Sequence, residues 1–421
     1  MPDLRPFRAL RFHPVVGSLS ELLAPPYDVI APDEAELLRK RHGANSVRLV
    51  LPEGAVPARY EVAARTLESW IDSGILELDS TPTVTVYRQT FSGPDAPITR
   101  HAVFAALQLS PFGEGEVLPH ERTHSGPKRD RLALTLATRT QLSPIFLTTR
   151  DEAGNLYALL KGISEGSEAD FRAETTEGVA HAAWRVADAD TCERLCRIAG
   201  AGPLLVADGH HRYETALEVR RQIGEDVPEA SSVLACVVSE QDPGLRIQPT
   251  HRVLKGPPPG SEAERWSDLL GENFTLHPLA DLQVSPGRLA DEAEKTGSSV
   301  LVTREGAWRL EPLPTAASDA GLDESDLAIA SIVLDRLVIE AILGSDADEA
   351  AHAGKLVYVR DPLEAVSVAG SSGAAFLLPA VDPEAVWKVT GLGRRLPPKS
   401  TYYEPKIPSG LLFRPLDDPA A

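Results

Sequence analysis

The feature that most constrains this chain is an abrupt change from a strand to a helix within residues 203–213. The apolar run 204–207 is typical of a strand that is buried on both faces. Gly209 supplies the backbone freedom for a sharp reversal, and helical periodicity begins within one or two residues of it. The first turn of a helix has backbone N–H groups without partners and carries the positive end of the helix dipole. The sequence therefore predicts an anion site at this turn.

Polar side chains occupy the same turn. Arg212 lies in the first turn of the predicted helix and can hold phosphate oxygens with two parallel N–H donors. His210 and His211 can donate hydrogen bonds or move protons near neutral pH. Because these groups follow a buried strand directly, they favour a catalytic site for phosphate chemistry. The alternative is that one histidine ring lies in solvent and the other packs in the core, with no catalytic role for either.

Asp208 has two interpretations, and both stay open at this stage. As a helix N-cap it would satisfy one backbone N–H, a role that contributes ~1 kcal/mol. A carboxylate would also repel a phosphate beside it unless a cation or a proton intervenes. Its position therefore also suggests a ligand for Mg²⁺ or a general base that acts on a substrate hydroxyl.

A second segment combines basic and acidic groups in an otherwise acidic protein. The charged residues of this stretch are Glu121, Arg122, Lys128, Arg129, Asp130 and Arg131. Clustered cations predict an anion site, and Glu121 among them could activate a hydroxyl toward a phosphoryl group. A solvated loop with weak ion pairs is the alternative. His120 and His124 have the spacing of zinc ligands on a helix, but Pro119, Gly126 and Pro127 argue against a continuous helix here.

Composition narrows the class of protein. The chain has 421 residues and a net charge of −19, so its long-range field repels nucleic acid and anionic membranes, and we expect neither as a partner. No apolar stretch reaches the ~20 residues of a membrane span, and the first residues do not resemble a leader, so we expect a cytoplasmic protein. Three cysteines imply no disulfide framework. The oligomeric state stays open.

Alternating helix and strand patterns predict a mixed α/β fold in two domains. The Pro/Gly-rich stretch 255–260 is the best linker, which places a catalytic domain at residues 1–255 and a second α/β domain at 256–421. A long apolar helix is expected at 328–343. The common nucleotide-binding motifs, Gly-x4-Gly-Lys-Ser/Thr and Gly-x-Gly-x-x-Gly after a strand, do not occur.

Several motifs together resemble a bacterial and archaeal family labelled as a domain of unknown function. The shared motifs are Pro-Pro-Tyr-Asp (25–28), His-Glu-Arg-Thr (120–123), Leu-Ser-Pro-Ile-Phe (142–146), Asp-Gly-His-His-Arg-Tyr (208–213) and Lys-Ser-Thr-Tyr (399–402). The Asp-Gly-His-His-Arg element also looks like the phosphate-binding turn of the ParB and sulfiredoxin superfamily. This resemblance implies a ParB/sulfiredoxin-like core.

The resemblance also implies an activity, namely phosphorylation of L-serine with inorganic pyrophosphate or a nucleotide as donor. Asp208, through Mg²⁺ or as a base, and Glu121 would act on the serine hydroxyl, with His210 and His211 beside them. The implied phosphate-binding residues are Gly209, Arg212, Arg122, Lys128, Arg129 and Lys399, and the implied substrate-binding residues are Tyr27, Asp28, His120, Thr123 and Tyr213. The segment 397–406 would return to the site. A nucleotide-binding regulatory protein and a phosphoserine phosphatase are the alternatives.

Overall fold

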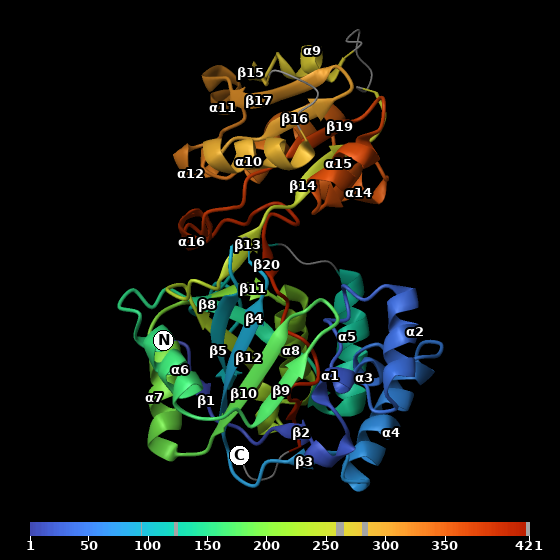
Figure 1. Ribbon diagram of the computed structural model, residues 1–421, viewed down its shortest axis with the longest axis vertical. Helices are drawn as coiled ribbons and strands as arrows, with labels where there is room; N and C mark the ends of the chain where they lie inside the picture. Colours follow the sequence, from blue (N-terminus) through green and yellow to red (C-terminus); the bar gives the residue numbers. More distant parts are fainter. Residues whose placement is uncertain (94, 122–124, 258–264, 280–284, 418–421) are drawn as a thin grey trace. The chain divides into compact units, whose positions relative to one another are not determined.

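The computed structural model describes residues 1–93, 95–121, 125–257, 265–279 and 285–417, without the side chains of 125–127. The chain divides into two compact units, which are described separately. The first is formed by residues 1–119, 123–246 and 405–421, and the second by residues 120–122 and 247–404. Each unit combines helices with a β-sheet (Figure 1), as the sequence predicts.

The predicted boundary after residue 255 differs from the observed one. The second unit already includes β14 (His251–Leu254), which pairs with strands on both sides in the sheet of that unit. The Pro/Gly-rich stretch follows β14 and therefore lies within the second unit rather than ahead of it. The last residues of the chain, from Pro405, belong to the first unit.

The first unit is built on a nine-stranded sheet in which β11 lies between β6 and β8. The first eight strands, in spatial order, are β6 (Val117–Pro119), β11 (Leu204–Asp208), β8 (Ile145–Thr149), β12 (Ser232–Ser239), β5 (Ile98–Gln108), β4 (Val84–Phe91), β10 (Ala180–Val186) and β9 (Phe171–Glu174). The ninth, β1 (Leu4–Arg5), pairs with β5. Two further pairs join β2 (Leu10–Phe12) with β3 (Leu76–Leu78) and β7 (Thr140–Gln141) with β21 (Arg414–Pro415).

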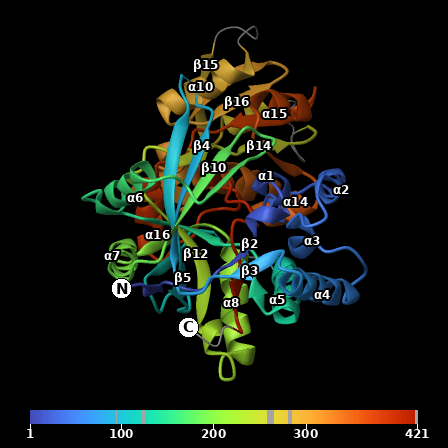
Figure 2. The same cartoon turned by 60° about the horizontal axis from the view of Figure 1, so that its bottom comes forward.

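Helices α6, α7 and α8 pack on strands of this sheet, and α5 packs on α8. α6 and α7 lie together on one side of the unit, and α2 to α5 gather on the opposite side (Figures 1 and 2). The α-helices are α1 (Leu19–Leu22), α2 (Pro32–Arg41), α3 (Val47–Val50), α4 (Ala58–Asp72), α5 (Ser125–Thr138), α6 (Asn155–Gly166), α7 (Ala189–Ala199) and α8 (His210–Ile223). Two 3₁₀ turns are η1 (Pro14–Val16) and η2 (Pro228–Ser231). The central strands are apolar on both faces, because β11 and β12 are covered on both sides.

The second unit has a six-stranded sheet of its own. Its spatial order is β15 (Phe274–Leu279), β17 (Gly306–Pro312), β16 (Val300–Thr303), β19 (Ala374–Leu377), β14 and β18 (Leu356–Val359). A separate pair joins β13 (Arg246–Gln248) and β20 (Tyr402–Glu404).

The helices of the second unit confirm the predicted position of an apolar helix but not its type. They are α9 (Trp266–Leu270), α10 (Pro286–Thr296), α11 (Pro314–Asp319), α12 (Glu324–Leu327), α13 (Ala330–Leu334), α14 (Ala347–His352), α15 (Pro362–Ala369) and α16 (Pro383–Gly391), with η3 (Asp335–Leu343) as a π-helix. The helix expected at 328–343 is therefore α13 followed by η3, whose hydrogen bonds span one residue more than those of an α-helix. Among the described residues, none of the helices has the length and apolar character to cross a membrane.

Candidate functional site

The predicted change from strand to helix occurs as the sequence indicates. β11 ends at Asp208, and α8 begins at His210. Gly209 between them has φ +101°, a backbone conformation that residues with a side chain rarely adopt. A Cβ atom at this position would lie 3.1 Å from Cζ of Arg212. The glycine is therefore needed both for the backbone reversal and for the close approach of the guanidinium.

The Asp208 side chain forms ion pairs with two cations of the first unit. Arg212 Nη2 donates to Oδ2, and Lys406 Nζ donates to Oδ1 at 2.5 Å. Arg212 also donates through Nη1 to the carbonyl oxygen of Pro144. The N-cap of α8 is Gly209, and no side chain caps this helix. The N-cap interpretation of Asp208 is therefore wrong, because its carboxylate is directed at the two cations instead.

These contacts determine the charge of Asp208. Burial by itself raises the pKa of this carboxyl, but the charges of Lys406 and Arg212 outweigh burial and hold the pKa well below its ordinary range. The group is therefore an anion at neutral pH. A carboxylate held in this way accepts a proton from a substrate poorly, which favours a role in orienting the two cations over the predicted role as a base.

This shift predicts how stability depends on pH. The pKa of Asp208 is lower in the folded than in the unfolded protein, so its stabilising effect is present above the unfolded value of ~3.9 and is lost as pH falls below it. We expect the difference in unfolding free energy between the natural protein and Asp208→Asn to be constant from pH 7 to 5. It should shrink steadily toward pH 2 in urea titrations. A difference that does not change with pH would contradict the ion-pair assignment.

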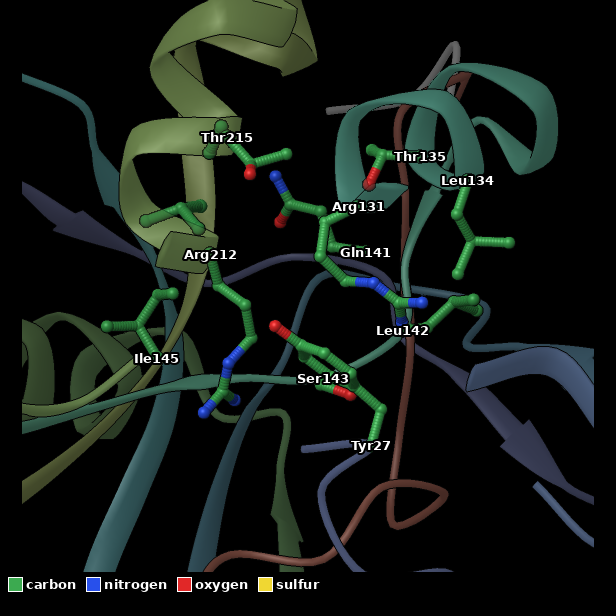
Figure 3. Close-up of a pocket in the computed structure, with 12 residues that line it drawn as sticks. Tyr27, Arg131, Leu134, Thr135, Gln141, Leu142, Ser143, Ile145, Arg212 and Thr215 are labelled. Carbon is green, nitrogen blue, oxygen red and sulfur yellow. The ribbon is translucent and has the colours of Figure 1, made fainter. Parts of the chain in front are cut away.

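A pocket of the first unit lies next to Arg212. Figure 3 shows Arg212 with Arg131, Tyr27, Ser143 and Thr215 around it. The cavity volume is about 50 Å³, several times the ~10–15 Å³ that one water requires and far below the ~300–1,000 Å³ of sites for drug-sized ligands. Thr135, Gln141 and several apolar side chains form the other walls. The pocket therefore suits a small polar molecule.

Tyr27, a predicted substrate-binding residue, lies on the wall of this pocket. The Arg131 guanidinium carbon is 3.9 Å from the centre of its ring. Burial raises the pKa of the Tyr27 hydroxyl, while Arg212 and Arg131 act in the opposite direction. The hydroxyl is thus protonated at neutral pH and can donate a hydrogen bond. Asp28 is exposed in the turn at 27–29.

The remaining predicted residues of the first unit differ in their surroundings. His210 is buried and His211 half-buried at the start of α8. Lys128 forms an ion pair with Glu214 of α8, and Arg129 is exposed. Arg122 and Thr123 lie outside the described residues.

Tyr213 does not have the surroundings expected of a substrate-binding residue. It is fully buried, and its hydroxyl donates to the backbone oxygen of Ser110 at 2.9 Å. Its ring stacks on Phe112, with the ring centres 4.7 Å apart. The position of Tyr213 therefore does not support a role in binding substrate. Arg212 and Tyr213 are consecutive residues of α8 and point about 100° apart around the helix axis. The sequence motif alone does not show which of these two directions faces the core.

Two predicted segments meet within the second unit. The Glu121 carboxylate accepts a hydrogen bond from the backbone N–H of Lys399 at 2.7 Å, and His120 Nε2 lies 2.6 Å from the hydroxyl of Thr401. Lys399 has φ +56°, and its own side chain is exposed. The His-Glu-Arg-Thr and Lys-Ser-Thr-Tyr motifs are therefore in contact through their described residues. Because Glu121 and Asp208 belong to different units, their joint action stays a prediction.

The donor set near Asp208 does not fit a resident Mg²⁺ ion. Both carboxylate oxygens accept hydrogen bonds from cationic groups, and two cations beside the carboxylate oppose a third. Over the described part of the chain, no group of three or more His, Cys, Asp and Glu side chains is arranged to hold a metal ion. The predicted magnesium site at Asp208 therefore lacks support from these residues.

Lys406 contacts Asp208, although the sequence assigns no role to it. It lies in the predicted returning segment 397–406, of which the sequence assigns Lys399 to phosphate. The segment divides at Pro405: residues up to Glu404 belong to the second unit, and Lys406 belongs to the first. The only signal in the sequence was the unusual number of phosphate-binding side chains in the segment, and that signal does not distinguish the two lysines.

No curated protein matches this chain. It is similar to a solved structure of a free serine kinase with AMP bound, with 13% identity and a TM-score of 0.36, covering 70% of this chain and 89% of that one. It is also similar to a conserved hypothetical protein from Pyrococcus furiosus, with 14% identity and a TM-score of 0.35, covering 70% of this chain and 90% of that one. A third similar structure is C-terminally truncated SbnI from Staphylococcus aureus, with 12% identity and a TM-score of 0.37, covering 72% of this chain and 87% of that one. Similarity at this level does not establish an activity. A family model matches residues 4–335, and the chain therefore belongs to the family described as "Protein of unknown function (DUF1015)".

Proposed function

We propose that this protein is a small-molecule kinase that transfers a phosphoryl group from inorganic pyrophosphate, or from a nucleotide, to the hydroxyl of L-serine. The observation that carries the proposal is the Asp208 carboxylate held between Arg212 and Lys406 at the start of α8. Two cations and a helix N-terminus in one place form a strong site for a phosphate group. The β11–α8 turn also supports the resemblance to the ParB and sulfiredoxin superfamily.

The donor phosphates would bind by replacing Asp208 as the partner of the two cations. Arg212 has a planar group with several N–H donors, which matches two phosphate oxygens at once, whereas Lys406 acts as a point charge. Because Gly209 has no Cβ, the Arg212 guanidinium lies against the backbone of the turn, and a phosphate bound to Arg212 would lie close to that backbone. Asp208 would repel the phosphate and keep both cations in place when the site is empty.

In the reaction, the serine hydroxyl oxygen forms a bond to the terminal phosphorus atom of the donor. The bond from that phosphorus to the bridging oxygen breaks, and inorganic phosphate, or the nucleotide shortened by one phosphate, leaves with the bonding electrons. Arg212 and Lys406 stabilise the negative charge on the phosphoryl oxygens and on the leaving group. The hydroxyl proton would pass to an oxygen of the leaving phosphate group, because Glu121, the base that the sequence predicts, belongs to the other unit.

The pocket beside Arg212 is the proposed place for the acceptor. Tyr27 and Ser143 offer hydroxyl groups, and Arg131, whose guanidinium pairs with Asp130, adds a cation to the wall. The cavity volume of about 50 Å³ favours a compact acceptor and leaves no space for a nucleoside in this pocket. A small donor such as pyrophosphate agrees with the absence of the common nucleotide motifs.

Formation of O-phosphoserine tests the proposal. The purified protein is incubated with L-serine and pyrophosphate, ATP or ADP, each with and without Mg²⁺, and the product is detected by mass spectrometry. We expect phosphoserine with at least one donor and none without a donor. No product with any donor would sink the proposal. Phosphate release from added phosphoserine would favour a phosphatase, and tight CTP binding without product would favour a nucleotide-binding regulator.

A further inference from the structure

Gln89 and Arg100 form a buried polar pair in the large sheet of the first unit. They lie directly opposite each other on the adjacent strands β4 and β5, and each is 1% exposed. Arg100 Nη2 donates to Oε1 of Gln89. A guanidinium that is removed from water is costly unless its donors find acceptors. The pair therefore requires an explanation beyond packing.

Both side chains also hold the backbone next to the site. Arg100 Nη2 donates to the carbonyl oxygen of Pro405, and Gln89 Nε2 donates to the carbonyl oxygen of Lys406 at 3.0 Å. Two consecutive carbonyl groups are thus held by two side chains of the sheet. All these residues belong to the first unit.

The pair is connected to the site from a second direction. The Arg100 guanidinium carbon is 4.9 Å from the centre of the Phe146 ring. Phe146 of β8 is paired in register with Asp208 of β11. The sheet therefore determines the position of Asp208, and the Gln89–Arg100 pair determines the position of the backbone that carries its partner Lys406.

We propose that Gln89 and Arg100 are positioning residues that direct the Lys406 ammonium into the anion site. A lysine side chain has four rotatable bonds and much conformational entropy, so a fixed backbone is needed to hold its charge in place. This inference deepens the proposed function and rests on it for its effect on catalysis. The contacts with Pro405 and Lys406 are independent of any substrate.

The substitution Gln89→Met tests the inference, because it keeps the size of the side chain and removes its hydrogen bonds. Acetic anhydride labelling followed by mass spectrometry reports the reactivity of Lys406 without any ligand. We expect labelling of Lys406 to rise about tenfold, as its ion pair with Asp208 becomes intermittent. Lys161, on α6, should be unchanged. Arg100→Lys keeps a cation, but its nitrogen lies one bond closer to the backbone than the Nη2 atom that reaches both acceptors, so it should give the same result.

A double-mutant cycle on pyrophosphate binding separates positioning from general stability. By calorimetry, Gln89→Met should weaken pyrophosphate binding about tenfold and Lys406→Ala about 100-fold. The double variant should bind like Lys406→Ala alone, because Gln89 acts through Lys406. The control Thr85→Val removes a buried hydroxyl on the same strand, where it accepts from Arg11. It should lower stability without altering pyrophosphate binding.

Two results would overturn the inference: unchanged Lys406 labelling in folded Gln89→Met, or fully multiplicative effects in the cycle. Failure of the natural protein to bind pyrophosphate or any other tested anion would contradict the proposed function instead. The labelling result would then still decide whether the pair holds Lys406.

Discussion

Replacing Asp208 by asparagine is expected to lower phosphoserine formation by about three orders of magnitude and, at the same time, to strengthen pyrophosphate binding a few-fold. The carboxylate lies where it repels an incoming phosphate, so its removal favours binding. Turnover falls because Arg212 and Lys406 are no longer fixed in the empty protein, so they bind the donor in more than one orientation and its phosphorus atom is less often aligned with the serine hydroxyl. Calorimetry and product analysis measure the two effects separately.

The same substitution should destabilise the empty protein. Removing one partner of a buried ion pair leaves the other charge without compensation, at a cost of about 3–5 kcal/mol. Pyrophosphate restores a counter-charge, so it should raise the melting temperature of Asp208→Asn more than that of the natural protein. Lower stability of the empty protein together with tighter pyrophosphate binding is the result expected if Asp208 is an anion that competes with the phosphate.

Asp79→Asn is the matched control. Asp79 is buried and forms ion pairs with Arg11 and Arg185 in the same unit. We expect a comparable loss of stability and no change in pyrophosphate affinity. If folded Asp208→Asn bound pyrophosphate more weakly than the natural protein, Asp208 would contribute to binding directly. Running the titrations with and without Mg²⁺ would then show whether a metal ion mediates that contribution.

Arg212→Lys is expected to reduce turnover about 100-fold or more, the typical effect of losing one donor to a charge that develops in a transition state. Lysine keeps the charge, but it cannot replace the planar group that reaches both Asp208 and the Pro144 carbonyl. The KM for pyrophosphate should rise about tenfold. Steady-state kinetics at saturating serine measure both parameters.

The control for this substitution lies on the same helix. Arg220 of α8 donates to the backbone oxygen of Leu109 at 2.7 Å and lies two turns beyond the site. Arg220→Lys therefore makes the same chemical change with the same loss of a carbonyl contact. We expect normal turnover from it. Equal losses in both variants would attribute the effect to the stability of α8 rather than to phosphate.

The strand, glycine and helix from 204 to 212 could be predicted because all the information is local. A buried strand needs an apolar run, a sharp reversal needs glycine, and a helix needs its periodicity, and these signals lie within a few residues of one another. The prediction of an anion site at Gly209–Arg212 follows from the same local chemistry. The mixed α/β class likewise depends only on alternating patterns along the chain.

The partners of these residues could not be predicted in the same way. Lys406 is 198 residues from Asp208 in the chain. The Gln89–Arg100 pair lies on β4 and β5, and the place of these two strands in the sheet depends on pairing with strands that are distant in the sequence. Tyr213, in the same motif as Arg212, faces the core, and Glu121 pairs with Lys399 of a distant motif. Sequence alone therefore determined where phosphate chemistry is expected. Tertiary structure decided which distant cation lies beside Asp208, because contacts between distant segments depend on the packing of the whole sheet.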